Sequence, residues 1–272
     1  MKATTIPASG ADHSENDRPV LMLLPGMVCN GRAWRHQARH LAGRCEPRVA
    51  DYGDARHMTD MARAVLAQAP ERFLLAGHSM GARVAMEVQR LAPHRIIGLC
   101  FAGTEYGPCP AGEAGRRETE TRNGLLALAR EQGMPAMARR WLPALLPEAR
   151  LADEPLVEEI LAMISEHSPD QLEAHIAAGA VRPDSRAVLC SITAPTLLLA
   201  GAEDRLRPSA AHREMADLIP GARLVEIPGA GHMLTMENPE AVNAALDEWV
   251  AACRPFCSRG AAPTPARPVN VD

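Results

Sequence analysis

The residues best suited to covalent chemistry lie in the pentapeptide Gly77-His78-Ser79-Met80-Gly81. The apolar run Phe73–Ala76 before it is typical of a short buried strand, and the segment 81–91 after it has apolar residues at the i, i+4, i+7 spacing of a helix. A Gly-x-Ser-x-Gly motif between a strand and a helix is a nucleophile elbow, in which a sharp turn raises the serine hydroxyl above the sheet. The flanking glycines let strand and helix pack closely. We therefore predict that Ser79 is a nucleophile.

A serine nucleophile needs a base and a carboxylate that orients the base, and both follow later strands. Asp204 comes just after the apolar run Thr196–Ala200, and His232 lies in a glycine-rich turn after the run Arg223–Ile227. Open parallel sheets place their chemistry at the carboxyl ends of the strands, so these residues should meet Ser79 there. The histidine would take the serine proton while the aspartate fixes its tautomer. We predict Asp204 and His232 as these partners.

Other ionisable residues near these motifs offer alternative assignments. Glu203, adjacent to Asp204, is an alternative orienting carboxylate. Glu105 follows a strand at a position that could serve the same purpose, but we expect it to be structural. Asp51 and Asp54 lie in a loop and should cap or turn the chain. His78 precedes the nucleophile, and its side chain should point away from the serine hydroxyl.

These motifs together resemble those of the α/β-hydrolase family. The resemblance also rests on Leu24-Pro25-Gly26-Met27 after the first strand, on Gly201-Ala202-Glu203-Asp204, and on Gly229-Ala230-Gly231-His232 with Glu237-Asn238-Pro239 following. It runs from about Arg18 to Arg254 and is strongest to small bacterial carboxylesterases, carrier-protein methyl esterases and enol-lactonases. One departure is Pro25, where many relatives have histidine.

The resemblance implies a serine hydrolase that cleaves a small-molecule ester through an acyl-enzyme, with an oxyanion hole made by the backbone N–H groups of Met27 and Met80. A lactonase or a C–C bond hydrolase on the same triad is the alternative, and a non-catalytic ligand-binding protein is a further one. No cofactor or metal is implied. An acyl-carrier protein is a candidate partner, and the oligomeric state cannot be predicted. Trp34 should pack the helix after the oxyanion loop rather than bind substrate.

The composition argues against several other classes of protein. The net charge is −4 and the pI about 6.2, which gives no reason to expect nucleic acid or an anionic membrane as a partner. The first nineteen residues are polar, without the apolar segment of a secretory signal, so we expect a cytoplasmic protein. The seven cysteines are scattered without Cys-x-x-Cys spacing, which favours reduced thiols over a zinc site or disulfides.

Strand and helix patterns alternate along most of the 272 residues, which predicts an open, mostly parallel α/β sheet of six strands with helices on both faces. The first two strands of the full hydrolase fold should be absent or vestigial. The expected strands are Val20–Leu24, Pro47–Ala50, Phe73–Ala76, Ile96–Ala102, Thr196–Ala200 and Arg223–Ile227. The expected core helices are Arg35–Ala42, Met58–Ala69, Gly81–Leu91, Ser209–Leu218 and Pro239–Ala252.

The alternation stops in the interval 105–186, which has helical patterns only. We expect this interval to form an all-helical cap inserted into a core of residues 19–104 and 187–254. A disordered leader (1–18) and a disordered, proline-rich tail (255–272) should flank them.

The expected cap should cover Ser79 and supply most of the substrate pocket. Candidate pocket residues are Met134, Met137, Trp141, Leu145 and Met163. Methionine at helical spacing is as often plain core, so both roles stay open. Because the chain has few aromatic residues, the pocket walls should be aliphatic and favour flexible acyl chains. The charged run 116–122 mixes signs at helical spacing and should form a solvated helix face.

Overall fold

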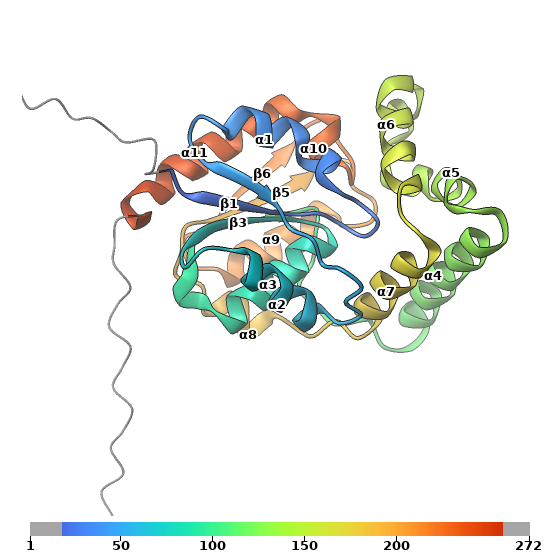
Figure 1. The fold of residues 1–272 in the computed structure, drawn as a ribbon, viewed down its shortest axis with the longest axis horizontal. Coiled ribbons are helices and arrows are strands. Elements are labelled where there is room, and N and C mark those ends of the chain that lie inside the picture. The colour runs from blue at the N-terminus through green and yellow to red at the C-terminus, as the bar shows by residue number, and fades with distance from the viewer. Residues whose placement is uncertain (1–17, 258–272) are drawn as a thin grey trace, which may run out of the picture.

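A computed structural model describes residues 18–257, and its centre is a parallel sheet of six strands (Figure 1). The strands are β1 (Val20–Leu24), β2 (Glu46–Val49), β3 (Phe73–His78), β4 (Ile96–Ala102), β5 (Thr196–Gly201) and β6 (Arg223–Ile227). Their order is β2-β1-β3-β4-β5-β6, and every neighbouring pair is parallel. The four inner strands are buried along their whole length because helices cover both faces of the sheet. The predicted six-stranded α/β sheet is confirmed, and among residues 18–257 no strand precedes β1.

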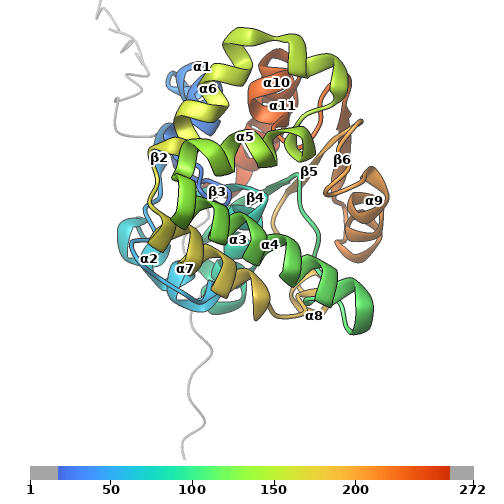
Figure 2. The ribbon, with the colours of Figure 1, turned by 90° about the vertical axis from the view of Figure 1, so that its right-hand side faces the viewer.

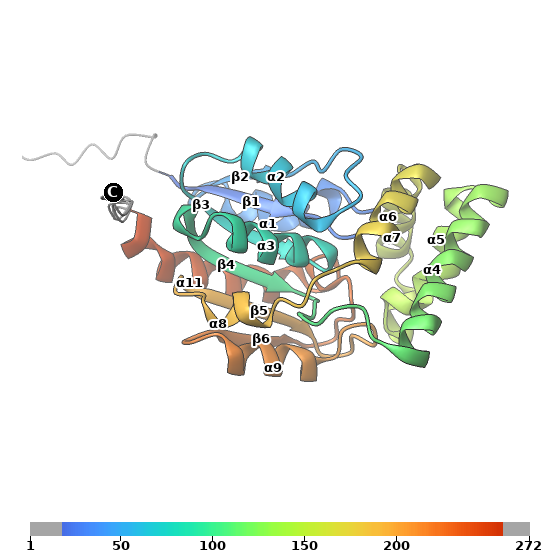
Figure 3. The same cartoon turned by 90° about the horizontal axis from the view of Figure 1, so that it is seen from below.

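Two layers of helices cover the sheet. One face carries α1 (Arg35–Leu41), α10 (Leu234–Glu237) and α11 (Pro239–Cys257). The other face carries α2 (Met58–Gln68), α3 (Met80–Leu91), α8 (Arg186–Cys190) and α9 (Ser209–Leu218), all visible from below in Figure 3.

Helix α11 is longer than its sequence pattern predicted. It continues to Cys257, whereas the tail was expected to start at residue 255, so that boundary was wrong by three residues. The reason is packing: Cys253 is fully buried, and Phe256 and Cys257 lie against the hydrophobic core. These apolar contacts stabilise the last turn of the helix. The rest of the expected tail, and the expected leader apart from Arg18, lie outside the described residues.

Four longer helices fill the stretch between β4 and β5, and we call residues 112–180 the helical insertion. Its helices are α4 (Gly112–Gln132), α5 (Met134–Leu145), α6 (Glu154–Ser165) and α7 (Pro169–Ala180). Local signals set their ends. Gly133 adopts a φ of 85° between α4 and α5, Asp153 caps α6, and Ser168 forms a capping box with Gln171 at the start of α7. The insertion lies across the end of the sheet toward which the strands run (Figures 1 and 2).

Candidate active site

Ser79 lies on a sharp turn between β3 and α3. Its backbone has φ 55° and ψ −116°, and its N–H donates to the carbonyl of Ala102 (2.8 Å). The flanking glycines are required by space. A Cβ at Gly77 would lie 2.5 Å from the backbone of Gly81 and Ala82, and one at Gly81 would lie 2.2 Å from the carbonyl oxygen of Leu24. The expected strand–turn–helix context of the serine is therefore present.

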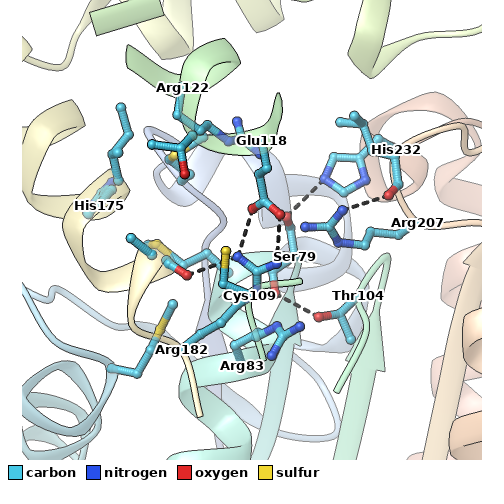
Figure 4. A pocket seen from close by; sticks show the side chains of 18 of the residues that line it. Ser79, Arg83, Thr104, Cys109, Glu118, Arg122, His175, Arg182, Arg207 and His232 are labelled. Atoms are coloured by element: carbon cyan, nitrogen blue, oxygen red, sulfur yellow. Dashed lines mark hydrogen bonds and ion pairs between the residues drawn. The ribbon is translucent and has the colours of Figure 1, made fainter. Parts of the chain in front are cut away.

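His232 connects Ser79 to Asp204. Its Nε2 lies 2.9 Å from Ser79 Oγ (Figure 4), and its Nδ1 lies 2.8 Å from Asp204 Oδ2. With Asp204 accepting the Nδ1 proton, Nε2 is left to accept the serine proton. Glu203 is exposed, and the carboxylate that contacts His232 is that of Asp204.

Asp204 is buried but remains suited to carry a negative charge. Burial acts to raise its pKa, but His232 and the backbone N–H groups of Leu206 (2.8 Å) and Arg207 (2.9 Å) outweigh burial. The pKa of Asp204 therefore lies below its usual value. An ionised carboxylate at this place stabilises a protonated His232.

The loop that carries His232 is fixed by three contacts that sequence reasoning did not assign. The His232 N–H donates to the carbonyl of Leu145 in α5 (3.0 Å), and its carbonyl lies 2.7 Å from Nε2 of His78. The N–H of Gly231 donates to buried Glu237 (2.9 Å). Burial lowers the pKa of His78 to about 3, so this histidine is neutral and positions His232 instead of acting as a base.

The loop after β1 brings Met27 into the cavity beside Met80. Among the hydrogen bonds of residues 18–257, neither residue's backbone N–H has an acceptor, and Met80 is the first residue of α3, where the helix dipole is positive. This arrangement fits the expected oxyanion hole. Next to it, Val28 has a φ of 46° and donates its N–H to Nδ1 of His175 in α7 (3.1 Å). Trp34 is fully buried, as expected for a packing role.

The structure corrects the expected substrate pocket. Of the five candidates only Trp141 lines the cavity above Ser79. Met134, Met137, Leu145 and Met163 are buried within the insertion and its contacts with the core, because the apolar faces of the helices pack on one another. The cavity is lined instead by Met27, Met58, Ser79, Met80, Arg83, Thr104, Cys109, Glu118, Thr119, Arg122, Asn123, Trp141, His175, Ile176, Gly179, Ala180, Arg182, Leu206, Arg207 and His232.

Four of these lining residues are arginines, so the expectation of purely aliphatic walls was wrong. The expectation of a solvated face at 116–122 was also wrong in part, because Glu118 and Arg122 point into the cavity. These two residues are four apart on α4 and so share one side of the helix. That spacing was visible in the sequence, but nothing there indicated which side would face Ser79.

Several absences apply to the described residues. Within 18–257 no cluster of three His, Cys, Asp or Glu side chains could hold a metal ion, and Cys29, Cys45, Cys100, Cys109, Cys190 and Cys253 are free thiols. None of the helices in this range combines the length and apolar character needed to cross a bilayer.

Comparisons with known proteins agree on one family. The model of the alpha/beta hydrolase family matches residues 16–245. The curated protein "Putative carbamate hydrolase RutD" of Azorhizobium caulinodans is 29% identical over 246 residues, which cover 83% of this chain and 89% of the relative. A thermophilic esterase from Thermogutta terrifontis superposes with a TM-score of 0.76 at 28% identity, over 86% of this chain and 90% of the esterase. The enol-lactonase of Burkholderia xenovorans shares the fold, with a TM-score of 0.76 at 20% identity, covering 88% of this chain and 92% of the enol-lactonase.

Proposed function

The chain belongs to the alpha/beta hydrolase family, and from that premise we propose that it is a serine hydrolase that cleaves small carboxylic esters through an acyl-enzyme. The observation that carries the proposal is the continuous chain from Asp204 through His232 to Ser79, with contacts of 2.8 and 2.9 Å, at the wall of a cavity. A serine, a histidine and an aspartate in this order support the proposal, because acyl transfer uses a nucleophile, a base and a carboxylate that orients the base.

In the proposed reaction, Ser79 Oγ attacks the ester carbonyl carbon while His232 Nε2 takes the hydroxyl proton. The negative charge that develops on the carbonyl oxygen is stabilised by the N–H groups of Met27 and Met80. When the tetrahedral intermediate collapses, the C–O bond breaks and His232 returns the proton to the leaving alcohol. A water molecule, deprotonated by His232, then attacks the acyl-enzyme and releases the carboxylic acid and free Ser79.

The triad alone does not select the leaving group. The similar proteins carry the names carbamate hydrolase, esterase and enol-lactonase, and each of these substrates has a carbonyl that a serine can attack. We propose the ester as the substrate class because the solved relative at 28% identity is named an esterase, and a carbamate and a lactone are the alternatives to test. A carrier-protein methyl ester is the larger substrate to test.

The test is a panel of p-nitrophenyl esters of graded chain length, with a carbamate, a lactone and a carrier-protein methyl ester measured alongside. Ser79→Ala should reduce ester hydrolysis by about a thousandfold or more while the circular dichroism spectrum is retained, because a nucleophile acts as a unit with its base. The matched control Ser191→Ala alters an exposed serine at the end of α8 and should keep wild-type rates.

A fluorophosphonate provides a second readout. It should add one covalent mass to the wild type and to the Ser191→Ala protein, and none to Ser79→Ala. Ester hydrolysis that survives in Ser79→Ala, or labelling at another residue, would show that Ser79 is not the nucleophile.

A further inference from the structure

The cavity above Ser79 contains more positive than negative charge. Arg83, Arg122, Arg182 and Arg207 all line it (Figure 4). The carboxylates that form ion pairs with Arg83, Arg182 and Arg207 are Glu118 and Glu105. These four guanidinium and two carboxylate groups together carry a formal charge of +2, next to the place where a substrate would bind.

Most of the available negative charge is already engaged. Glu118 contacts Arg182 through both oxygens, at 2.7 and 2.8 Å. Glu105 is shared among three guanidinium groups, at 3.0 Å from Arg83, 3.3 Å from Arg207 and 3.4 Å from Arg182. Glu105 and Glu118 together supply two negative charges for Arg83, Arg182 and Arg207, so one of these three positive charges is uncompensated.

Arg122 forms no ion-pair contact with a carboxylate within the described part of the chain, although Glu118, one turn away on α4, attracts it electrostatically. Its guanidinium carbon lies 5.4 Å from the ring centroid of Trp141, which also lines the cavity, and no ion pair to it is formed among residues 18–257. A stacked guanidinium keeps its N–H edges free for a planar anion. Burial lowers the pKa of Arg122 to about 10, which still leaves it charged at neutral pH.

Arg83 independently indicates that the cavity binds an anion. Its side chain is only 6% exposed, yet its buried Nη1 has no hydrogen-bond partner. Burial lowers the pKa of Arg83 to about 10, so it too stays protonated at neutral pH. A buried, charged donor without a partner is costly unless a ligand supplies the acceptor.

We propose that the substrate is an ester that also carries a free carboxylate, and that Arg122 binds this carboxylate while Arg83 and Arg207 add to the attraction. The inference rests on the proposed ester hydrolysis and names its substrate class. Apolar side chains of Met58, Ile176 and Leu206 line the same cavity and suit a short methylene chain between the ester and the carboxylate. A monoester of an aliphatic dicarboxylic acid has this form.

The decisive measurement compares two esters that differ only in charge. Monomethyl adipate has a carboxylate where methyl 6-amino-6-oxohexanoate has a neutral amide, and proton release reports the hydrolysis of both. The wild type should prefer the carboxylate ester in kcat/KM. Arg122→Gln should lower that preference by about tenfold to a hundredfold, which is the range for hydrogen bonds to a charged group.

Two further variants control for charge and for folding. Arg122→Lys keeps a cation and should retain part of the preference. Arg116→Gln makes the same change as Arg122→Gln at an exposed position of α4 outside this cavity, and it should leave the preference unchanged. Because Glu118 stays hydrogen-bonded to Arg182 through both oxygens, replacing Arg122 leaves no carboxylate without a contact. The pair 5-acetoxypentanoate and 5-acetoxypentanamide shows whether the carboxylate is also recognised on the alcohol side.

Binding to the Ser79→Ala protein separates this inference from the proposed function. Calorimetry should detect adipate and not adipamide, and Arg122→Gln added to this background should abolish the difference. If adipate binds but the wild type does not cleave esters, the proposed reaction is contradicted and the proposed anion-binding site is supported. If charged and neutral esters are cleaved with equal kcat/KM and Arg122→Gln changes neither value, the proposed anion-binding site is contradicted and the proposed ester hydrolysis is supported.

Discussion

Ser79 and Val28 are the two non-glycine residues of the described chain with a positive φ, at 55° and 46°. Such conformations cost about 1–3 kcal/mol each and persist only where neighbours enforce them. Ser79 is held by the carbonyl of Ala102 and by the glycines around it, and Val28 by the ring of His175. Both strained residues belong to the two loops that meet above the sheet, so strain in this molecule is concentrated where the proposed chemistry takes place.

At the residue scale, the first prediction separates two adjacent carboxylates. Asp204→Asn should lower kcat by about 10⁴, because an amide in place of the carboxylate favours the wrong tautomer of His232. Glu203→Gln should stay within a few-fold of the wild type, since Glu203 is exposed and the contact to Nδ1 is made by Asp204. Steady-state hydrolysis of one good ester, measured at a single pH for both variants, tests this. A larger loss in Glu203→Gln than in Asp204→Asn would reverse the assignment.

Glu237 should make stability depend on pH. Burial raises its pKa to about 7, so between about pH 4.5 and 7 the unfolded chain loses this proton and the folded chain keeps it. The free energy of unfolding should therefore fall as pH rises through that window, by at most about 3 kcal/mol. Glu237→Gln can still accept the N–H of Gly231 and should remove that contribution.

Urea unfolding at pH 5 and pH 8 measures this effect. The gain in stability of Glu237→Gln over the wild type should be larger at pH 8 than at pH 5. The control Glu240→Gln, at the exposed start of α11, should keep the wild-type pH dependence. A gain that is equal at both pH values would mean that Glu237 is ionised in the folded protein.

At the scale of elements, the core strands and their helices could be predicted because each has a pattern longer than one turn or one pleat. Helices α8 and α10 were missed, since five and four residues are too few to establish a period. Periodicity also identifies an apolar face without telling what it packs against. Met137 and Trp141 are one turn apart on α5, yet only Trp141 faces the cavity.

The contact between α7 and the loop after β1 predicts an effect of the insertion on catalysis. His175→Ala removes the acceptor for the Val28 N–H, so the strained loop that carries Met27 should lose its geometry. We expect kcat to fall about tenfold, less than the loss of an oxyanion donor itself, with a smaller change in KM. His175→Asn, which can offer a side-chain oxygen near the same place, should recover part of the rate.

Burial lowers the pKa of His175 to about 4, so its Nδ1 stays available as an acceptor at neutral pH and is lost only in acid. The rate difference between wild type and His175→Ala should therefore be constant from pH 6 to 9. A large rise in KM together with the fall in kcat, or no recovery in His175→Asn, would point to general misfolding of α7 instead.

At the scale of the whole molecule, the insertion and the core are joined by charged pairs from distant parts of the chain. Arg35 in α1 contacts Glu159 in α6 at 2.7 Å, and Arg56 before α2 contacts Glu173 in α7 at 3.6 Å. The candidate triad could be predicted because each member lies in a local motif with its own strand. The arginine cluster could not, because it forms only when α3, α4, the end of α7 and the loop after β5 are brought together in three dimensions.

Glu105 has two roles at this scale, and its removal should change stability and substrate preference in opposite senses. It is the shared partner of three guanidinium groups that come from the core and from the chain that follows the insertion. Glu105→Gln should lower the free energy of unfolding by about 1–3 kcal/mol, below the range for fully buried pairs because the side chain is 31% exposed. The same change leaves the cavity more positive, so the preference of kcat/KM for a carboxylate ester over its amide should rise severalfold in the molecules that remain folded.

Urea unfolding measures the effect on stability, and the pair of charged and neutral esters measures the effect on substrate preference. The control Glu113→Gln removes an exposed carboxylate of α4 outside the cavity and should alter neither. A loss of stability together with a weaker preference for the anion would mean that Glu105 organises the arginines for binding and does not compete with the substrate for them.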